Sequence, residues 1–285
     1  MIAVYLPALN LLVNKARPPK PEVSLFARIA TEHLSRMPSK SVTKQSAAKS
    51  VEAKLAQNSV PRKTSATRKQ ALAPERIKKI LGLLAAAYPN AECALHHHNA
   101  WELLVATILS AQCTDARVNM VTPVLFKKYP TPADLAAAPL EDIEEIIRTT
   151  GFYRNKAKSI KGAAHKIISD FSGKVPRTME ALLTVPGAAR KTANVVLGVA
   201  YGIAVGVVVD THVLRLSRRL ELTTETTPEK VEQDLMKIIP QDHWIAFSHE
   251  MIHHGRQVCI ARKPRCTDCT LEKVCNSSDK TWSTH

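Results

Sequence analysis

The stretch Leu183-Thr-Val-Pro-Gly-Ala-Ala-Arg-Lys-Thr-Ala193 decides how this chain folds. Pro186 and Gly187 predict a tight turn between two helical patterns. The second helix is expected to begin at about Arg190 and to continue through the apolar residues 195–197. Backbone N–H groups at such a turn, next to a helix N-terminus, form an anion site suited to a DNA phosphate. The stretch therefore predicts a helix–hairpin–helix arrangement that binds a polyanion.

Lys191 lies in the first turn of the predicted second helix, where the positive end of the helix dipole disfavours a charged amine. The neighbouring Arg190 acts in the same direction, so we expect a lowered pKa for Lys191. A neutral amine is the nucleophile that Schiff-base chemistry at a sugar C1′ requires. A lysine at this position can also serve only as a phosphate contact, and the hairpin alone leaves both roles open.

Asp210 follows Lys191 by 19 residues, in the stretch Val208-Val-Asp-Thr-His212. An aspartate at the start of a helix, expected here over His212–Arg219, is often only an N-cap. Its carboxylate can also activate Lys191 or a water molecule and stabilise positive charge that develops on a sugar. Lys191 and Asp210 are therefore the candidate catalytic pair.

Four cysteines fall within 17 residues in the pattern C-x6-C-x2-C-x5-C. Thiolates at this density can close on one soft metal centre without ligands from elsewhere. Zinc is the alternative to an iron–sulfur cluster, but structural zinc sites usually pair two short Cys-x-x-Cys-like turns. One tight pair with two outlying ligands fits a four-thiolate cluster better. The expected ligands are Cys259, Cys266, Cys269 and Cys275, and the basic residues Arg262 and Lys263 between the first two would face phosphate.

Outside these motifs, the pattern from Pro74 onward is one helix after another, and the fold class is predicted to be all-α. Pro74-Glu75 suits a first helical turn, and Tyr88-Pro-Asn90 ends that helix. Thr131-Pro132 and Thr227-Pro228 are further helix starts. Residues 203–209 read equally well as a strand or as a buried extended linker. Other helices are expected at Trp101–Ala111, Leu140–Thr149 and Asn155–Phe171.

The charge balance is strongly basic, with 40 Lys and Arg against 25 Asp and Glu, a net charge of +15. Residues 1–73 hold 13 of these cations and 3 Glu, so they carry +10 of the excess. They contain no Asp and show no helical or strand period, which predicts a disordered arm. Three roles are open for the arm: extra electrostatic DNA affinity, an organelle transit segment, or a dispensable extension.

The remaining composition favours an intracellular protein. No apolar run reaches the ~20 residues that span a bilayer. The cysteines are crowded rather than spread as in a secreted disulfide framework, which favours a reducing compartment.

Together, the motifs resemble the endonuclease III family of helix-hairpin-helix DNA glycosylases, closest to its bacterial members. The resemblance covers about Pro74 to Asn276. The matching stretches are Leu109-Ser-Ala-Gln-Cys-Thr-Asp115, Gly151-Phe-Tyr-Arg-Asn-Lys-Ala157, Val185-Pro-Gly-Ala-Ala-Arg-Lys-Thr-Ala-Asn-Val-Val196, Val209-Asp-Thr-His212, and His254-Gly-Arg256 leading into the cysteines.

The resemblance implies a two-domain fold that binds double-stranded DNA with a damaged base or an abasic site. One domain, 93–203, would be a six-helix barrel that holds the hairpin. The other, 74–92 plus 204–285, would carry a [4Fe-4S] cluster. The activity implied is removal of oxidised pyrimidines followed by β-elimination through a Schiff base on Lys191, with Asp210 as the carboxylate. The implied DNA contacts are Gln112, which fills the gap left by the flipped nucleotide, and Lys156, Gly187, Ala189 and Arg190.

Three features depart from the family pattern, one of which is Cys113 directly after Gln112, interpreted as a packing residue. The second glycine of the hairpin is replaced by Ala189, which cannot adopt a positive φ cheaply, so the turn geometry is in question. The segment His96-His-His-Asn-Ala100 replaces the usual helix entry; a solvated loop fits it better than a metal site. We expect a monomer in the bacterial cytoplasm, with an organelle as the second choice and no membrane partner.

Three other protein classes share part of the pattern. An adenine-specific mismatch glycosylase has the same fold and cluster, but it lacks the hairpin lysine and usually continues well past the last cysteine. A non-catalytic, cluster-bearing DNA-binding protein would not need the pair Lys191 and Asp210. A zinc-finger regulator would not need it either.

Overall fold

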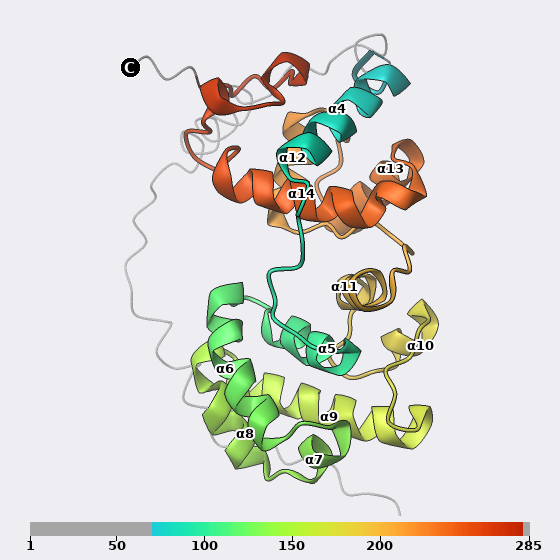
Figure 1. Cartoon of the computed structure of the whole chain (residues 1–285), viewed down its shortest axis with the longest axis vertical. Coiled ribbons are helices and arrows are strands. Elements are labelled where there is room, and N and C mark those ends of the chain that lie inside the picture. Colours follow the sequence, from blue (N-terminus) through green and yellow to red (C-terminus); the bar gives the residue numbers. More distant parts are fainter. Residues whose placement is uncertain (1–69, 282–285) are drawn as a thin grey trace, which may run out of the picture. The chain divides into compact units, whose positions relative to one another are not determined.

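The computed structural model describes residues 70–281, and every regular element within that range is helical (Figure 1). The prediction of an all-α fold is confirmed. The prediction of a disordered basic arm concerns residues 1–73, nearly all of which lie outside the described range.

Seven α-helices surround the first hydrophobic core. Its fully buried residues include Leu103, Leu104 and Ile160. Helix α11 contacts both α5 and α10, so the hairpin is built on this core. The helices are α5 (Ala100–Leu109), α6 (Asp115–Lys128), α7 (Pro132–Ala137), α8 (Leu140–Ile147), α9 (Tyr153–Phe171), α10 (Met179–Leu183) and α11 (Arg190–Tyr201).

Four α-helices form the second core, which is centred on Leu84, Val213, Phe247 and Met251. Helix α14 packs against both α4 and α12 (Figure 1). The cysteine segment joins this core through Leu271 and Val274. The helices are α4 (Pro74–Ala87), α12 (Thr211–Arg219), α13 (Pro228–Ile238) and α14 (Trp244–Gln257). Residues of the two cores come largely from the two predicted domains, whose boundaries we keep as a proposal.

An extended segment without strand pairing links α11 to α12, which settles the alternative left open for residues 203–209. Val207 and Val209 are buried in the second core. The backbone N–H of Val208 donates to the Ser248 hydroxyl. The segment is therefore anchored at three successive residues directly before Asp210.

Helices α5 and α12 each begin one residue earlier than predicted, at Ala100 and Thr211. Three other helix boundaries differ by two residues, and backbone conformation explains two of these three. Helix α5 ends at Leu109 rather than Ala111, and Gln112 just beyond it has a left-handed φ of 53°. Helix α9 begins at Tyr153 because Phe152, with φ 47°, is its left-handed N-cap. Helix α8 ends at Ile147, and a 3-10 turn, η1 (Arg148–Thr150), replaces its expected last turn.

Among the helices of residues 70–281, none combines the length and hydrophobicity needed to cross a membrane.

Candidate active site and cysteine centre

The hairpin between α10 and α11 requires glycine at Gly187. This residue has φ +81°, a region that L side chains rarely adopt. A Cβ here would lie 3.0 Å from the Cβ of Ser159 and 3.2 Å from Cγ2 of Ile108. The backbone of the turn therefore packs directly against α9 and α5, and the other side of Gly187 is exposed to solvent.

Ala189 is the N-cap of α11 and has φ −77° and ψ 170°, an extended conformation open to any residue. The predicted conflict between alanine and the hairpin backbone is therefore wrong. Ala189 offers no side-chain acceptor to the first turn of α11. The backbone N–H groups of residues 190–192 donate to no described residue, so they are available to an anion.

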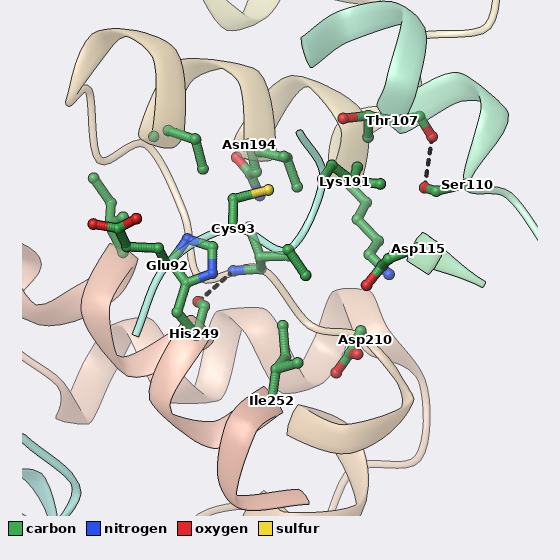
Figure 2. A pocket seen from close by; sticks show the side chains of 18 of the residues that line it. Glu92, Cys93, Thr107, Ser110, Asp115, Lys191, Asn194, Asp210, His249 and Ile252 are labelled. Atoms are coloured by element: carbon green, nitrogen blue, oxygen red, sulfur yellow. Dashed lines mark hydrogen bonds between the residues drawn. The ribbon is translucent and has the colours of Figure 1, made fainter. Parts of the chain in front are cut away.

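Lys191 and Asp210 line the same cavity, whose volume is about 130 Å³ (Figure 2). Lys191 comes from the first turn of α11, and Asp210 immediately precedes α12. Apolar walls come from Val195 and Val199 on α11 and from Ile252 on α14. The structure thus brings together the two residues that the sequence selected as a catalytic pair.

The Asp210 carboxylate caps α12 with one oxygen and has no described partner for the other. Its Oδ1 accepts hydrogen bonds from the backbone N–H groups of His212 and Val213, each at 2.8 Å. Its Oδ2 makes no hydrogen bond to a described residue, and Asp210 is half-buried against the cavity. One oxygen is fixed by the helix, and the other is available for chemistry.

The Lys191 amine is exposed and makes no ion pair within residues 70–281. Its neighbour Arg190 points to a different partner, Glu232 of α13, with Nε–Oε2 and Nη2–Oε1 distances of 3.0 and 3.1 Å. This pairing raises the pKa of Arg190. Asn194 donates to the same carboxylate at 2.8 Å. Arg190 therefore ties α11 to α13, and its guanidinium is already bound.

The cavity wall includes an ion pair that was not predicted from the sequence. Arg256, near the end of α14, contacts the Asp115 carboxylate at the start of α6 at 2.5 Å, and both line the cavity. Both residues lie inside stretches that carried the family resemblance. Only their spacing of 141 residues along the chain hid the contact from sequence reasoning.

Lys156 does not fit the DNA-contact role predicted for it. Its side chain is buried at 6% exposure, and its ammonium donates to the Thr150 carbonyl at 2.8 Å. Burial lowers the pKa of Lys156. The ammonium therefore fixes the turn before α9, and its contribution is structural.

Phe152, in that same turn, is 65% exposed and follows Gly151 with its φ of 70°. Gln112 is exposed and also left-handed. Helix α6, which follows the Gln112 loop, contacts the turn η1 that precedes Phe152, so the two left-handed residues lie on neighbouring segments. The sequence analysis assigned no role to Phe152. An aromatic residue that follows a glycine at a helix start could have indicated a functional position.

All four cysteines of the predicted centre line a single cavity next to the second core. Among residues 70–281, no group of three or more His, Cys, Asp or Glu side chains is arranged to hold a metal ion. Arg219 of α12 donates to Cys259 Sγ at 3.2 Å and to the Ile260 carbonyl at 2.8 Å. Arg215, one turn earlier, donates to the Cys259 carbonyl at 2.9 Å. Helix α12 thus connects Asp210 at one end to the cysteine segment at the other.

Arg262 and Lys263 lie between the first two cysteines, and both are exposed. Lys263 has a left-handed φ of 54°, so the loop is sharply bent there. Neither side chain forms a hydrogen bond or ion pair with a described residue, which leaves both cations available to a polyanion.

Two of the three histidines before α5 are held by local side-chain contacts, and the backbone N–H of the third, His96, donates to Asn119 Oδ1 at 2.9 Å. His98 Nδ1 lies 2.9 Å from Glu102 Oε2, and His97 Nδ1 lies 2.8 Å from the Leu95 carbonyl. Asn99 caps α5 through the Glu102 backbone N–H. The segment enters the helix as an ordinary capped loop.

Comparison with known proteins defines the class of the molecule. A family model described as HhH-GPD superfamily base excision DNA repair protein matches residues 105–241, which include the hairpin, Lys191 and Asp210. The endonuclease III of Synechocystis sp. is 56% identical over 215 residues, which make up 75% of this chain and 98% of that protein. The endonuclease III of Bacillus subtilis is 44% identical and covers 72% of this chain and 94% of its own length.

A solved structure gives the same result. The trapped endonuclease III–DNA covalent intermediate, an estranged-adenine complex, has a TM-score of 0.68 and 46% sequence identity. The alignment covers 72% of this chain and 96% of that one. The chain belongs to the endonuclease III family. It is therefore a base-excision DNA repair enzyme of the glycosylase and lyase class, and DNA is its partner.

Proposed function

We propose that this enzyme removes oxidised pyrimidines from double-stranded DNA and then cuts the strand at the resulting abasic site. The observation that carries the proposal is one cavity with an unpaired Lys191 amine and a free Asp210 carboxylate oxygen on its wall. Support for covalent chemistry comes from a relative that was trapped as a covalent intermediate with DNA.

The proposed reaction begins when the neutral Lys191 amine attacks C1′ of the flipped nucleotide. The bond between C1′ and the base breaks, and the base leaves with the bonding electron pair. The Asp210 carboxylate stabilises positive charge on the sugar and accepts a proton from the attacking nitrogen. The C1′–O4′ bond then breaks, O4′ takes the bonding electron pair and the proton held by Asp210, and a protonated Schiff base remains between Lys191 and C1′.

Strand cleavage follows from the acidity that the Schiff base confers on the neighbouring carbon. Loss of a proton from C2′ pushes electrons toward the iminium nitrogen. The C3′–O bond breaks, and the phosphate leaves on the 3′ side of the lesion. Hydrolysis of the imine then releases Lys191 for another cycle.

We assign DNA binding to three surfaces. The free N–H groups at the start of α11, together with Gly187 and Ala189, are suited to one backbone phosphate. The exposed Arg262 and Lys263 are suited to another.

Gln112 and the exposed Phe152 form the third surface. Both have strained left-handed backbones, which concentrate at functional sites. We propose that they occupy the space a nucleotide leaves when it turns into the cavity.

We further propose that Cys259, Cys266, Cys269 and Cys275 hold a [4Fe-4S] cluster. Four thiols around one space, with the Arg219 and Lys280 side chains on its wall, fit a negatively charged cluster. The cluster would fix the loop that presents Arg262 and Lys263 and would take no part in the bond changes at C1′. Iron and sulfide content of the purified protein tests this assignment.

Covalent trapping tests the proposed mechanism. A duplex with one abasic site is incubated with the enzyme and sodium borohydride, which reduces a Schiff base to a stable amine. We expect a DNA adduct with the native chain and none with Lys191→Ala, while binding of the uncut duplex stays within about threefold. Lys127→Ala, an exposed lysine change on α6, is the matched control. An adduct that persists in Lys191→Ala would refute the assignment.

We place the enzyme in the bacterial cytoplasm, bound to DNA as a monomer. The curated relatives named above are bacterial endonuclease III enzymes, which supports this placement.

A further inference from the structure

The cavity has a second polar wall that faces Lys191 and is not used by the proposed chemistry. Figure 2 shows Lys191, Asp115 and Asp210 on one side of the cavity, with Cys93 and His249 across from them. A base attached to a sugar at Lys191 would extend toward this wall. A polar group on this wall that has no protein partner would therefore be available to contact such a base.

Most of the polar groups on the cavity wall already have partners. The Ser110 hydroxyl donates to the Thr107 carbonyl at 2.8 Å, and the Thr107 hydroxyl donates to the Leu103 carbonyl at 2.7 Å. The Ser248 hydroxyl donates to the Trp244 carbonyl at 2.8 Å and accepts from a backbone N–H. None of these hydroxyls has its proton free for a ligand.

His253 is similarly engaged. Its Nε2 lies 3.4 Å from the Glu92 carbonyl, and its ring lies 6.2 Å from that of Tyr88, the C-cap of α4. These contacts direct His253 toward α4, although it also lines the cavity.

The His249 ring has no partner among the described residues, and neither do the exposed Glu92 carboxylate and Asn194 Oδ1, but of these three only the imidazole can donate as well as accept. His249 lies one turn before His253 on α14, is half-buried, and points into the cavity toward Cys93 (Figure 2). Neither ring nitrogen forms a hydrogen bond with a described residue. Burial lowers the pKa of His249 and the His253 ring acts in the same direction, while the Glu92 carboxylate opposes them; the net lowering favours the neutral ring at pH 7. A neutral imidazole has one donor and one acceptor nitrogen, and both are free here.

We propose that His249 is the residue that reads the exocyclic group of the flipped pyrimidine, and this inference rests on the function proposed above. Thymine-derived and uracil-derived lesions carry a carbonyl at C4, whereas cytosine-derived lesions carry an amine. A neutral imidazole can present its N–H to the carbonyl or its bare nitrogen to the amine by changing tautomer. One side chain thereby accepts both classes of oxidised pyrimidine.

A comparison of substrates with and without a base tests the role of His249. The full-length enzyme and His249→Leu are assayed on three duplexes with one 5-hydroxyuracil, one 5-hydroxycytosine or one preformed abasic site. Loss of a buried hydrogen bond should lower kcat/KM for both base-containing duplexes by about tenfold to a hundredfold. Cleavage of the abasic duplex, which has no base to read, should stay within twofold.

Two further variants complete the test. His249→Gln also offers a donor and an acceptor, so it should recover most of the activity on both lesions. His253→Leu changes an identical side chain one turn away and should leave the ratio of base excision to abasic cleavage unchanged.

The outcomes separate the two proposals. If His249→Leu lowers abasic cleavage as much as base excision, or if it changes neither, His249 does not read the base. If the native enzyme cuts the abasic duplex without forming a borohydride-trapped adduct, the lysine mechanism fails first. Retained abasic cleavage in His249→Leu also shows that the variant is folded.

Discussion

Ala189 is the N-cap residue of α11, but its side chain makes no capping hydrogen bond. A substitution at this residue should therefore change helix stability and DNA affinity in opposite directions. An aspartate there would accept hydrogen bonds from the free N–H groups of the first turn. We therefore expect Ala189→Asp to raise the free energy of unfolding by about 0.5–2 kcal/mol. The same carboxylate would fill the proposed phosphate site and repel DNA. Affinity for duplex DNA should fall at least tenfold, measured with chemical denaturation and fluorescence anisotropy.

Thr227 provides the matched control for Ala189. It is the N-cap of α13 and makes no side-chain cap hydrogen bond. Thr227→Asp should add similar stability and leave DNA affinity unchanged, because α13 has no assigned phosphate. If Ala189→Asp gains stability and keeps its affinity, the start of α11 does not bind a phosphate.

At the scale of elements, the position of Lys191 depends on a buried polar network between α11 and α13. The Glu232 carboxylate, with a side chain 8% exposed, binds Arg190 and Asn194. Gly206 of the linker lies against this carboxylate, and a Cβ there would collide with Glu232 Oε1 and come within 2.9 Å of Asn194 Nδ2. The network thus holds α11, the linker before Asp210 and α13 in one arrangement.

We predict that Gly206→Ala disrupts this network. Overpacking a buried site costs about 1–3 kcal/mol, and a shift of about 1 Å at Lys191 can lower turnover about a hundredfold. Thermal unfolding and single-turnover cleavage measure the two effects. Gly82→Ala is the control. Gly82 lies on the exposed face of α4, and a Cβ there would have nothing within 4 Å. This variant should have a free energy of unfolding about 0.5–1 kcal/mol higher than the native protein and should keep full activity. Native turnover in Gly206→Ala would show that the network does not position Lys191.

Features that depend on residues close together in the sequence could be predicted, whereas features that depend on contacts between distant residues could not. Helix starts were predictable because Thr131 and Pro74 act on their own neighbours. The catalytic pair was predictable because each residue lies in a distinctive local motif. The Asp115–Arg256 ion pair was not, since its partners are 141 residues apart. The buried state of Lys156 was missed for the same reason: a lysine on a helix reads as exposed until the packing of its turn is known.

At the scale of the whole molecule, net charge is divided unequally along the chain. Residues 1–73 carry 13 Lys and Arg and 3 Glu, a net of +10, whereas residues 74–285 carry 27 and 22, a net of +5. Affinity for DNA falls with salt by about 0.9 logarithmic units per neutralised phosphate for each tenfold rise in concentration. If the first segment contributes only electrostatic affinity, its deletion should affect the salt dependence of binding and not the chemistry.

Deletion of residues 1–69, all outside the described range, makes this expectation measurable. The slope of log affinity against log salt should become shallower by about 0.9 for each contact that the segment makes with a phosphate. Turnover at saturating DNA should stay within twofold, because Lys191, Asp210 and the cavity around them are built from residues 92–256. An unchanged slope would show that the segment makes no phosphate contacts. A large loss of saturated turnover, with an unchanged unfolding temperature, would instead mean that the segment takes part in catalysis.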